Sequence, residues 1–342
     1  MLAWAKRQWF LCILLAMLPL GYYYPAPGLW VKNYFPITYM VWSMLFLSAY
    51  TLATGAILNA FKCLRSLALI MALGYVVAPL LAYTAMLLFF GPESDYRIGL
   101  LLASAAPSTL ASSIIWTRLG KGNDALALAG TMFMNLTGFL TAPLILQVTL
   151  SQQVQLNPVA MAENLLFTLL LPVAAGQIAR AVNTDVAKRL KKPASTLNQV
   201  ITLLLVLTAI SRAAQEAGKK NVTAGDILLV VFAVGVVHLL TLIVGWYGGR
   251  TIGIPRADRI AVSITGSQKT LAVGTYIAET FFPAYPFAVL PIMFYHATQL
   301  VTDSLIVDVW KKKAGDTEVS SLASTCPRAD ACSSGDVPKD TA

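Results

Sequence analysis

Apolar stretches of about 20 residues follow one another along almost the whole chain, with short polar connectors between them. A helix of that length matches the hydrocarbon thickness of a bilayer. Because lipid cannot hydrogen-bond a backbone, each such segment must satisfy its own amide groups, as a helix does. We therefore expect an all-α polytopic membrane protein with about ten transmembrane helices. The expected spans are 8–24, 36–58, 66–90, 97–118, 124–149, 159–181, 195–213, 225–249, 257–282 and 286–310.

Composition supports an integral membrane protein. Of the 342 residues, 57% are hydrophobic and 12% are charged, whereas a soluble domain carries about 25% charged residues. The net charge of +9 comes from connectors between the apolar stretches, which argues against a nucleic-acid partner. No pair of catalytic acids in a coherent context, no His-Glu-x-x-His pattern and no Gly-x-Ser-x-Gly elbow occurs in the sequence, so no enzyme is expected.

The distribution of Lys and Arg tests the number of spans. Ten spans would place 19 of these residues on one side of the membrane and 5 on the other, with Lys269 alone inside it. Since cytoplasmic loops carry the excess positive charge, both termini are expected in the cytoplasm. The membrane is expected to be the cell membrane or an inner membrane. The start of the chain has two interpretations. Lys6-Arg7 before the apolar run 9–20 resembles a secretory signal peptide, whereas Tyr22-Tyr23-Tyr24 favours the interfacial end of a retained first span.

Ten spans divide into two groups of five, over 1–150 and 151–313. A Ser-, Thr- and Asp-rich tail over 314–342 follows and is expected to be disordered and cytoplasmic. With an odd number of spans per group, the second group enters from the opposite side, which gives the inverted repeat common among secondary transporters. Interrupted helices are then expected at corresponding positions of the two groups. The fourth span is interrupted at Pro107 and the ninth at the polar, glycine-containing segment 263–270.

Polar residues at these two breaks, and on the fifth and tenth spans, form one candidate solute site. Hydroxyl groups after Pro107 can satisfy freed backbone groups or coordinate a cation, although they can also simply cap their own kinked helix. The polar stripe at 296, 299 and 303 is either a proton relay or a hydrogen-bonded seam between helices. The candidate residues are Pro107, Ser108, Thr109, Ser112, Ser113, Thr131, Asn135, Ser263, Gly266, Ser267, Gln268, Lys269, Thr270, His296 and Gln299, with Asp303 on the same stripe.

Lys269 lies within a predicted span, and a lysine at bilayer depth costs at least about 2.5–3.5 kcal/mol. One hypothesis is that its ammonium is a tethered cation that takes the place of a bound sodium ion. The alternative is that it reaches the interface or pairs with a backbone carbonyl. Half-helix N-termini that face the bilayer midplane favour an anion, and a positive side chain nearby favours one too. An organic anion is therefore the expected solute.

Several of these segments together resemble the bile acid:sodium symporter superfamily over nearly all spans. The resemblance is strongest to the subgroup that contains the orphan seventh member of the human bile-acid carrier family and its bacterial relatives. The segments that carry it are Pro107-Ser108-Thr109 through Ser112, Thr117, Gly122-Asn123, Ala257-Asp258, Gly266-Ser267-Gln268-Lys269-Thr270-Leu271, and Leu290-Pro291-Ile292-Met293-Phe294-Tyr295-His296 with Gln299-Leu300.

The resemblance implies a ten-helix fold with a core domain and a panel domain, in which broken helices 4 and 9 cross in the core. It also implies transport of organic anions with sodium. The positions that match the family's sodium ligands are Ser112, Ser113, Thr131 and Ser267. Two positions depart from the family: Ala127 replaces a serine ligand, and Ser263 replaces the glutamate between two sodium sites. Two sodium ions beside the Lys269 ammonium would repel it strongly.

The expected function is secondary active transport of a small organic anion by alternating access. Coupling to sodium follows from the family, and proton coupling or uncoupled transport are the alternatives that Lys269 raises. A non-transporting membrane sensor that binds a ligand in the same cavity is the alternative function. The expected partners are the solute and the lipid bilayer, in a monomer or weak homo-oligomer, with no cofactor other than Na⁺ as a coupling ion.

Overall fold

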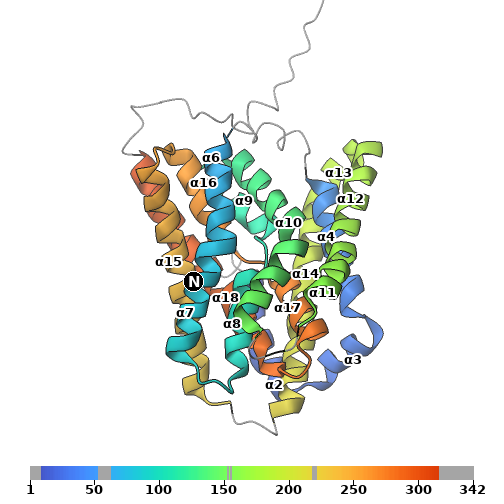
Figure 1. The fold of residues 1–342 in the computed structure, drawn as a ribbon. Helices are drawn as coiled ribbons and strands as arrows, with labels where there is room; N and C mark the ends of the chain where they lie inside the picture. Colours follow the sequence, from blue (N-terminus) through green and yellow to red (C-terminus); the bar gives the residue numbers. More distant parts are fainter. Residues whose placement is uncertain (1–8, 53–62, 152–153, 155, 218–221, 316–342) are drawn as a thin grey trace, which may run out of the picture.

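The chain folds as a bundle of helices (Figure 1). The computed structural model describes residues 9–52, 63–151, 154, 156–217 and 222–315, and no strand occurs in these ranges. The helices of the first half are α2 (Trp9–Tyr23), α3 (Ala26–Tyr34), α4 (Ile37–Thr51), α6 (Leu64–Ala72), the π-helical η2 (Leu73–Val77), α7 (Ala78–Phe89), α8 (Asp95–Ala105), α9 (Leu110–Leu119) and α10 (Asp124–Leu150). Those of the second half are α11 (Pro158–Leu165), the π-helical η3 (Leu166–Leu170), α12 (Leu171–Val182), α13 (Thr184–Arg189), α14 (Lys191–Ala217), α15 (Ala224–Thr251), α16 (Arg256–Ser267), α17 (Leu271–Phe281), η4 (Pro286–Ala288) and α18 (Val289–Gly315).

Helices occupy each of the ten ranges predicted as spans. Five helical segments of the described chain are long and apolar enough to cross a membrane, and seven are when each sharply bent pair counts as one span. Both bent pairs lie in the first half: α2 with α3, at 99°, and α8 with α9, at 66°. The protein is therefore an all-helical integral membrane protein with several spans. Of the predicted tail over 314–342, the part from 316 onward lies outside the described residues.

One connector between the predicted spans is itself helical. The prolines and glycine at 25–28 are typical of a turn, but they begin helix α3. Proline is well suited to the first turn of a helix, because the amide that it lacks would have no partner there and its fixed φ is helical. Pro25 is the N-cap and Pro27 lies in the first turn, with Gly28 buried against α14. The turn signal was therefore a helix-start signal.

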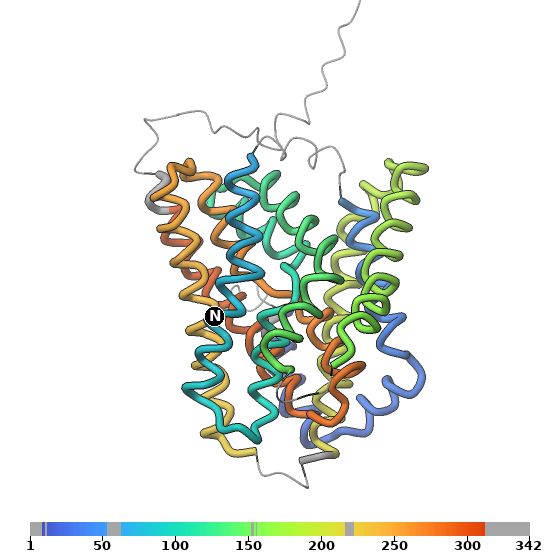
Figure 2. Tube along the Cα trace, in the orientation of Figure 1, coloured from blue at the N-terminus to red at the C-terminus, as the bar shows by residue number. Residues whose placement is uncertain are grey.

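Two groups of helices face each other across the bundle. In one group, α4 packs against α12 and α14, and α14 also packs against α2 and α3. In the other, α16 packs against α6, α10 and α15, while α18 packs against α8 and α15. The tube trace shows α4, α12 and α14 on one side and α6, α15 and α16 on the other (Figure 2).

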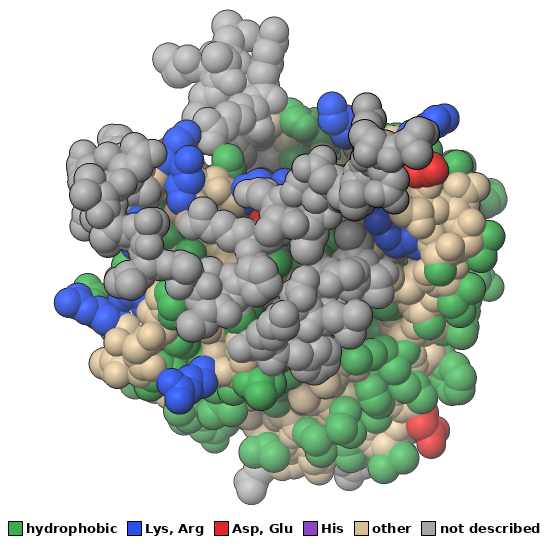
Figure 3. Space-filling view, turned by 90° about the horizontal axis from the view of Figure 1, so that it is seen from above, with side chains coloured by type: hydrophobic (Ala, Val, Ile, Leu, Met, Phe, Trp, Pro, Cys, Tyr) green, Lys and Arg blue, Asp and Glu red, His purple; other side chains and the backbone are tan. Residues whose placement is uncertain are grey.

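One end of the bundle carries a group of positive side chains. Figure 3 looks down on the end where α9 and α13 finish, and Lys and Arg side chains outnumber acidic ones there. Arg118 lies in the last turn of α9, and Lys188 and Arg189 lie in the last turn of α13. The clustering agrees with the charge asymmetry of the sequence.

Candidate functional site

The two predicted helix breaks meet in the structure. Helix α8 ends at Ala105 and α9 begins at Leu110, while α16 ends at Ser267 and α17 begins at Leu271. The backbone amide of Thr270 donates a hydrogen bond of 2.8 Å to the carbonyl of Pro107. Broken helices free backbone groups that need partners away from lipid, and here each break supplies a partner for the other.

Gln268 joins the breaks to α18. Its Oε1 accepts hydrogen bonds from the hydroxyls of Thr109 (2.6 Å) and Ser112 (2.8 Å), which also contact each other. Its Nε2 donates to Oδ2 of Asp303 at 2.6 Å. The Gln268 side chain is fully buried, so all of its hydrogen bonds are made within the protein. Gln268 was predicted as a site residue, and it connects three separate segments.

Asp303 and His238 form a buried pair behind this network. Nε2 of His238 lies 3.1 Å from Oδ1 of Asp303, and Nδ1 of His238 lies 3.3 Å from the carbonyl of Ser267. The hydroxyl of Tyr295 donates to the same carbonyl at 2.9 Å. Sequence reasoning missed this pair, because His238 stands alone among Val and Leu residues on α15. The available signal was Asp303, on the polar stripe of the tenth span.

Lys269 points away from the breaks. Its ammonium donates a 2.6 Å hydrogen bond to the carbonyl of Gly74, within the π-helical segment η2. The side chain of Gln299 brackets the backbone of Lys269, accepting from its amide (2.8 Å) and donating to its carbonyl (3.0 Å). The same Nε2 lies 2.9 Å from Nδ1 of His296. Lys269 is 2% exposed, and within the described residues no carboxylate pairs with it.

Two of the four candidate sodium ligands contact each other directly, and the other two make different hydrogen bonds. Oγ of Ser113 lies 2.8 Å from Oγ1 of Thr131, so these two are together. Ser112 is turned to Gln268, and Oγ of Ser267 lies 3.3 Å from the carbonyl of Ile264 in its own helix. No group of three or more His, Cys, Asp or Glu side chains that could hold a metal occurs in the described part of the chain.

The remaining candidates have local or packing contacts. Nδ2 of Asn135 donates to the carbonyls of Ser108 (3.0 Å) and Thr131 (2.8 Å). Oγ of Ser263 donates to the carbonyl of Arg259 at 2.8 Å. Gly266 packs on η2, where a Cβ would lie 2.7 Å from the side chain of Leu73. Gly266 therefore permits close helix packing.

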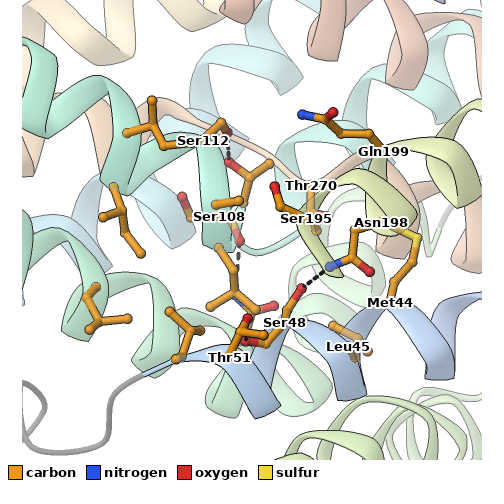
Figure 4. A pocket seen from close by; sticks show the side chains of 18 of the residues that line it. Met44, Leu45, Ser48, Thr51, Ser108, Ser112, Ser195, Asn198, Gln199 and Thr270 are labelled. Atoms are coloured by element: carbon orange, nitrogen blue, oxygen red, sulfur yellow. Dashed lines mark hydrogen bonds between the residues drawn. The ribbon is translucent and has the colours of Figure 1, made fainter. Parts of the chain in front are cut away.

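A cavity of about 620 Å³ lies between the two helix groups (Figure 4). Figure 4 shows Ser108 and Ser112 on one wall, and Ser195, Asn198 and Gln199 of α14 on the opposite wall. The predicted site residues that line the cavity are Ser108, Thr109, Ser112, Asn135, Thr270 and His296. The others, Pro107, Ser113, Thr131, Ser263, Gly266, Ser267, Gln268, Lys269 and Gln299, lie outside that lining.

Comparison with known proteins identifies the family. Residues 8–312 match the SBF-like CPA transporter family. The chain belongs to this family. Membership agrees with the resemblance drawn from the sequence, and it indicates a transporter and no enzyme.

Three relatives are similar to this chain at low sequence identity. The chain is 28% identical over 217 residues to the "Putative symporter YfeH" of Escherichia coli, which covers 63% of this chain and 65%, just under two thirds, of that protein. It is 28% identical to the "Probable sodium/metabolite cotransporter BASS4, chloroplastic" of Oryza sativa, over 92% of this chain and 78% of that one. It is 22% identical to "Sodium/bile acid cotransporter 7" of Danio rerio, over 90% of this chain and 94% of that protein.

Proposed function

We propose that the protein is a secondary active transporter that moves a small organic anion by alternating access. The observation that carries this proposal is the cavity between two helix groups, with both broken helices at its wall. Secondary transporters hold their solute at discontinuous helices, and rock one group of helices against the other around it. Transporters of metabolites and bile acids among the relatives support a small-molecule solute.

The proposed topology has ten spans, with an inverted repeat of five spans over 1–150 and another over 151–313. The breaks at Pro107 and Gln268 occupy the fourth span of each repeat, which supports this pairing. Helices α2, α3, α4, α12 and α14 would form the panel, and the helices that pack around α16 and α18 would form the core. Both termini are placed in the cytoplasm, on the more positive side of the membrane.

The core has the contacts needed to move as one body. The hydrogen bonds made by Gln268, Asp303 and Lys269 all stay within the core segments. No hydrogen bond of this network reaches α4, α12 or α14 among the described residues. A rocking motion would therefore leave the buried polar network intact.

The solute is proposed to be an anion. Helices α9 and α17 both begin at the cavity, with Thr109 and Thr270 as their N-caps. Neither cap side chain accepts a hydrogen bond from a backbone amide of its helix, so neither competes with a ligand for the amide groups of the first turn. The positive end of a helix dipole favours a negative group at such a position.

For the coupling ion, we propose one sodium ion held near Ser113 and Thr131, whose hydroxyls lie 2.8 Å apart. The ammonium of Lys269 would supply a fixed positive charge in place of a second ion. Proton-coupled or uncoupled transport is the competing account, and it needs no sodium site.

Two measurements test these proposals. In proteoliposomes, accumulation of a labelled carboxylate against its gradient supports transport, whereas binding without accumulation supports a sensor. The coupling ion is tested by thermal unfolding in sodium and in choline at equal ionic strength. Because a ligand that binds only the folded state at 100 times its dissociation constant adds about 2.7 kcal/mol, sodium should raise the melting temperature of the wild type. A Ser113→Ala variant should lose that increase, and no sodium effect on the wild type would refute the sodium site.

A further inference from the structure

We infer that Arg180 is the residue that binds the anionic group of the solute, and that the solute is a carboxylate that also carries a hydrogen-bond donor. This inference rests on the proposed transport function and names the substrate class of the same cavity. Neither Arg180 nor its neighbours on α14 were candidates in the sequence, where Arg180 counted only as a loop-proximal positive charge.

Arg180 is a buried cation with no acidic partner in the described part of the chain. It lies on α12, lines the cavity and is 8% exposed. Its Nη1 donates a 3.1 Å hydrogen bond to the carbonyl of Tyr50, a neutral group. Within the described residues no carboxylate lies within 4.0 Å of its guanidinium. Because an uncompensated buried charge is strongly unfavourable, an anion in the cavity would relieve that cost.

The packing of α12 on α4 fixes the position of this guanidinium. One helical turn before Arg180, a Cβ on Gly176 would lie 2.6 Å from the carbonyl oxygen of Phe46, so the two backbones touch. The next residue, Gln177, donates a 2.6 Å hydrogen bond to the carbonyl of Ala49. Arg180 is thus anchored through three successive contacts to one helix, which presets it for a ligand.

The other three cations that line the cavity are paired with a carboxylate or exposed to solvent. Arg118 forms a salt bridge with Asp124, with 2.5 Å between nitrogen and oxygen. Lys188 pairs with Asp185 at 3.2 Å, and both side chains are exposed. Lys191 is exposed, where water screens its charge. Arg180 alone among the four cavity cations combines burial with the absence of an acidic partner in the described structure, and a guanidinium binds a carboxylate through two parallel hydrogen bonds.

A second group in the cavity lacks a partner. Oδ1 of Asn198 is buried and accepts no hydrogen bond in the described structure, while its Nδ2 donates to Oγ of Ser48 at 2.8 Å (Figure 4). A buried acceptor without a donor costs about as much as a lost hydrogen bond. A hydroxyl or amide N–H of the solute would satisfy it.

The two groups both belong to the panel. Asn198 is hydrogen-bonded to Ser48 and Arg180 to Tyr50, both on α4, and both side chains line the same cavity. The donor and the carboxylate therefore belong on one solute molecule, as in a hydroxy or amido acid. The apolar side chains of Leu45, Leu110 and Ile114 also line the cavity and suit an aliphatic body.

The test uses the full-length protein in nanodiscs and three probes: 2-hydroxyhexanoate, hexanoate and 1,2-hexanediol. Ligand-induced changes in melting temperature give apparent dissociation constants for the wild type and for Arg180→Gln, Arg180→Lys and Asn198→Leu. A matched control is Lys188→Gln, which removes a cavity cation that already has a partner. Glutamine at position 180 can still donate to the Tyr50 carbonyl, so Arg180→Gln should fold.

The expected order of affinity for the wild type is hydroxyhexanoate, then hexanoate, then the diol. Arg180→Gln should weaken binding of both acids about tenfold to a hundredfold, since it removes a charge-assisted hydrogen bond. Lys188→Gln should leave binding unchanged. Asn198→Leu should remove the preference for the hydroxy acid over hexanoate. Without probe, the melting temperature of Arg180→Gln should be no lower than that of the wild type, because the variant loses an uncompensated charge.

Three results would overturn the inference: equal binding of the acids and the diol by the wild type, unchanged acid binding by Arg180→Gln, or no binding of either acid by the wild type. The results distinguish an incorrect role for Arg180 from an incorrect transport function. Acid binding that depends on Arg180 without accumulation in proteoliposomes would reject transport alone. Accumulation that survives Arg180→Gln would reject the role of Arg180 alone.

Discussion

Replacing Gln268 with methionine should destabilise the protein by several hydrogen bonds' worth of free energy. The substitution keeps the length of the side chain but removes three hydrogen bonds, from Thr109, from Ser112 and to Asp303. The last of these is made to a carboxyl group that is 0% exposed. Asp303 would then keep His238 as its partner but lose an amide donor at 2.6 Å.

The magnitude follows from the kinds of bond lost. A neutral hydrogen bond contributes about 0.5–1.5 kcal/mol, and one to a charged group contributes about 1.5–3 kcal/mol. In membrane proteins each side-chain hydrogen bond averages nearer 0.6 kcal/mol, because the unfolded chain in the bilayer also finds partners. Between these limits, Gln268→Met should lower the free energy of unfolding by about 2–4 kcal/mol.

The measurement is reversible unfolding of the purified protein in mixed micelles, with Gln199→Met as the matched control. Gln199 also lines the cavity, and its side chain makes no hydrogen bond in the described structure. Its substitution should change stability by less than about 0.5 kcal/mol, as a substitution away from such a network does. Equal effects of the two substitutions would refute the description of Gln268 as the junction of the breaks. So would additivity of Gln268→Met and Asp303→Asn, because bonded partners should couple.

Three further predictions concern packing and ion pairs elsewhere in the bundle. In thermal unfolding, Gly176→Ala should lower the free energy of unfolding by about 1–3 kcal/mol, because the new Cβ would overlap a main-chain oxygen of α4. The control Gly248→Ala has open space around it, so it should leave the free energy of unfolding unchanged or raise it by up to about 1 kcal/mol. In the same assay, Asn123→Ala should lower the free energy of unfolding by about 1–3 kcal/mol, since the asparagine side chain caps α10 and donates to a buried aspartate. A decrease below about 0.5 kcal/mol would contradict this. Glu279→Gln should speed hydrogen exchange at the end of α17 by breaking a 2.6 Å ion pair to α14, and Lys32→Gln, whose half-exposed ammonium lies at 3.6 Å, should have little effect.

The sequence was sufficient to predict an all-helical membrane protein and the helix breaks at Pro107 and Gln268. Apolar length sets where a helix can lie in a membrane, and Pro107 removes a donor wherever it stands. The break at Gln268 follows from polar residues and a glycine in an apolar run, which lipid cannot solvate. These are local properties, so one sequence carries them. Helix α3, between the first two predicted spans, was not predicted: proline is common both in turns and at the start of a helix, and the packing of Gly28 on α14 distinguishes these outcomes.

The partners of the polar residues could not be predicted, because they depend on helix rotation and on contacts between distant segments. His238 and Asp303 are 65 residues apart, and no sequence motif links the two positions. Lys269 could have faced the cavity or a backbone carbonyl, and the π-helical turn at Gly74 decides for the carbonyl. Arg180 carried no signal beyond its charge, since only the fold shows that no carboxylate of the described residues pairs with it.

The contacts between the two helix groups differ at their two ends, and this difference bears on how transport would proceed. From the cavity residue Thr202, α14 continues ten residues to Arg212, or about 15 Å of helix. From Ala272, α17 continues seven residues to Glu279, or about 10 Å. The two side chains form a mostly buried ion pair of 2.6 Å, and Arg212 also donates to the carbonyl of Pro283 at 2.7 Å. No comparable ion pair joins the groups near Arg118 at the other end in the described residues. The structure therefore fits a state that is closed at the Arg212 end, and opening that end requires breaking the Arg212–Glu279 pair together with the longer, more exposed Lys32–Glu279 pair.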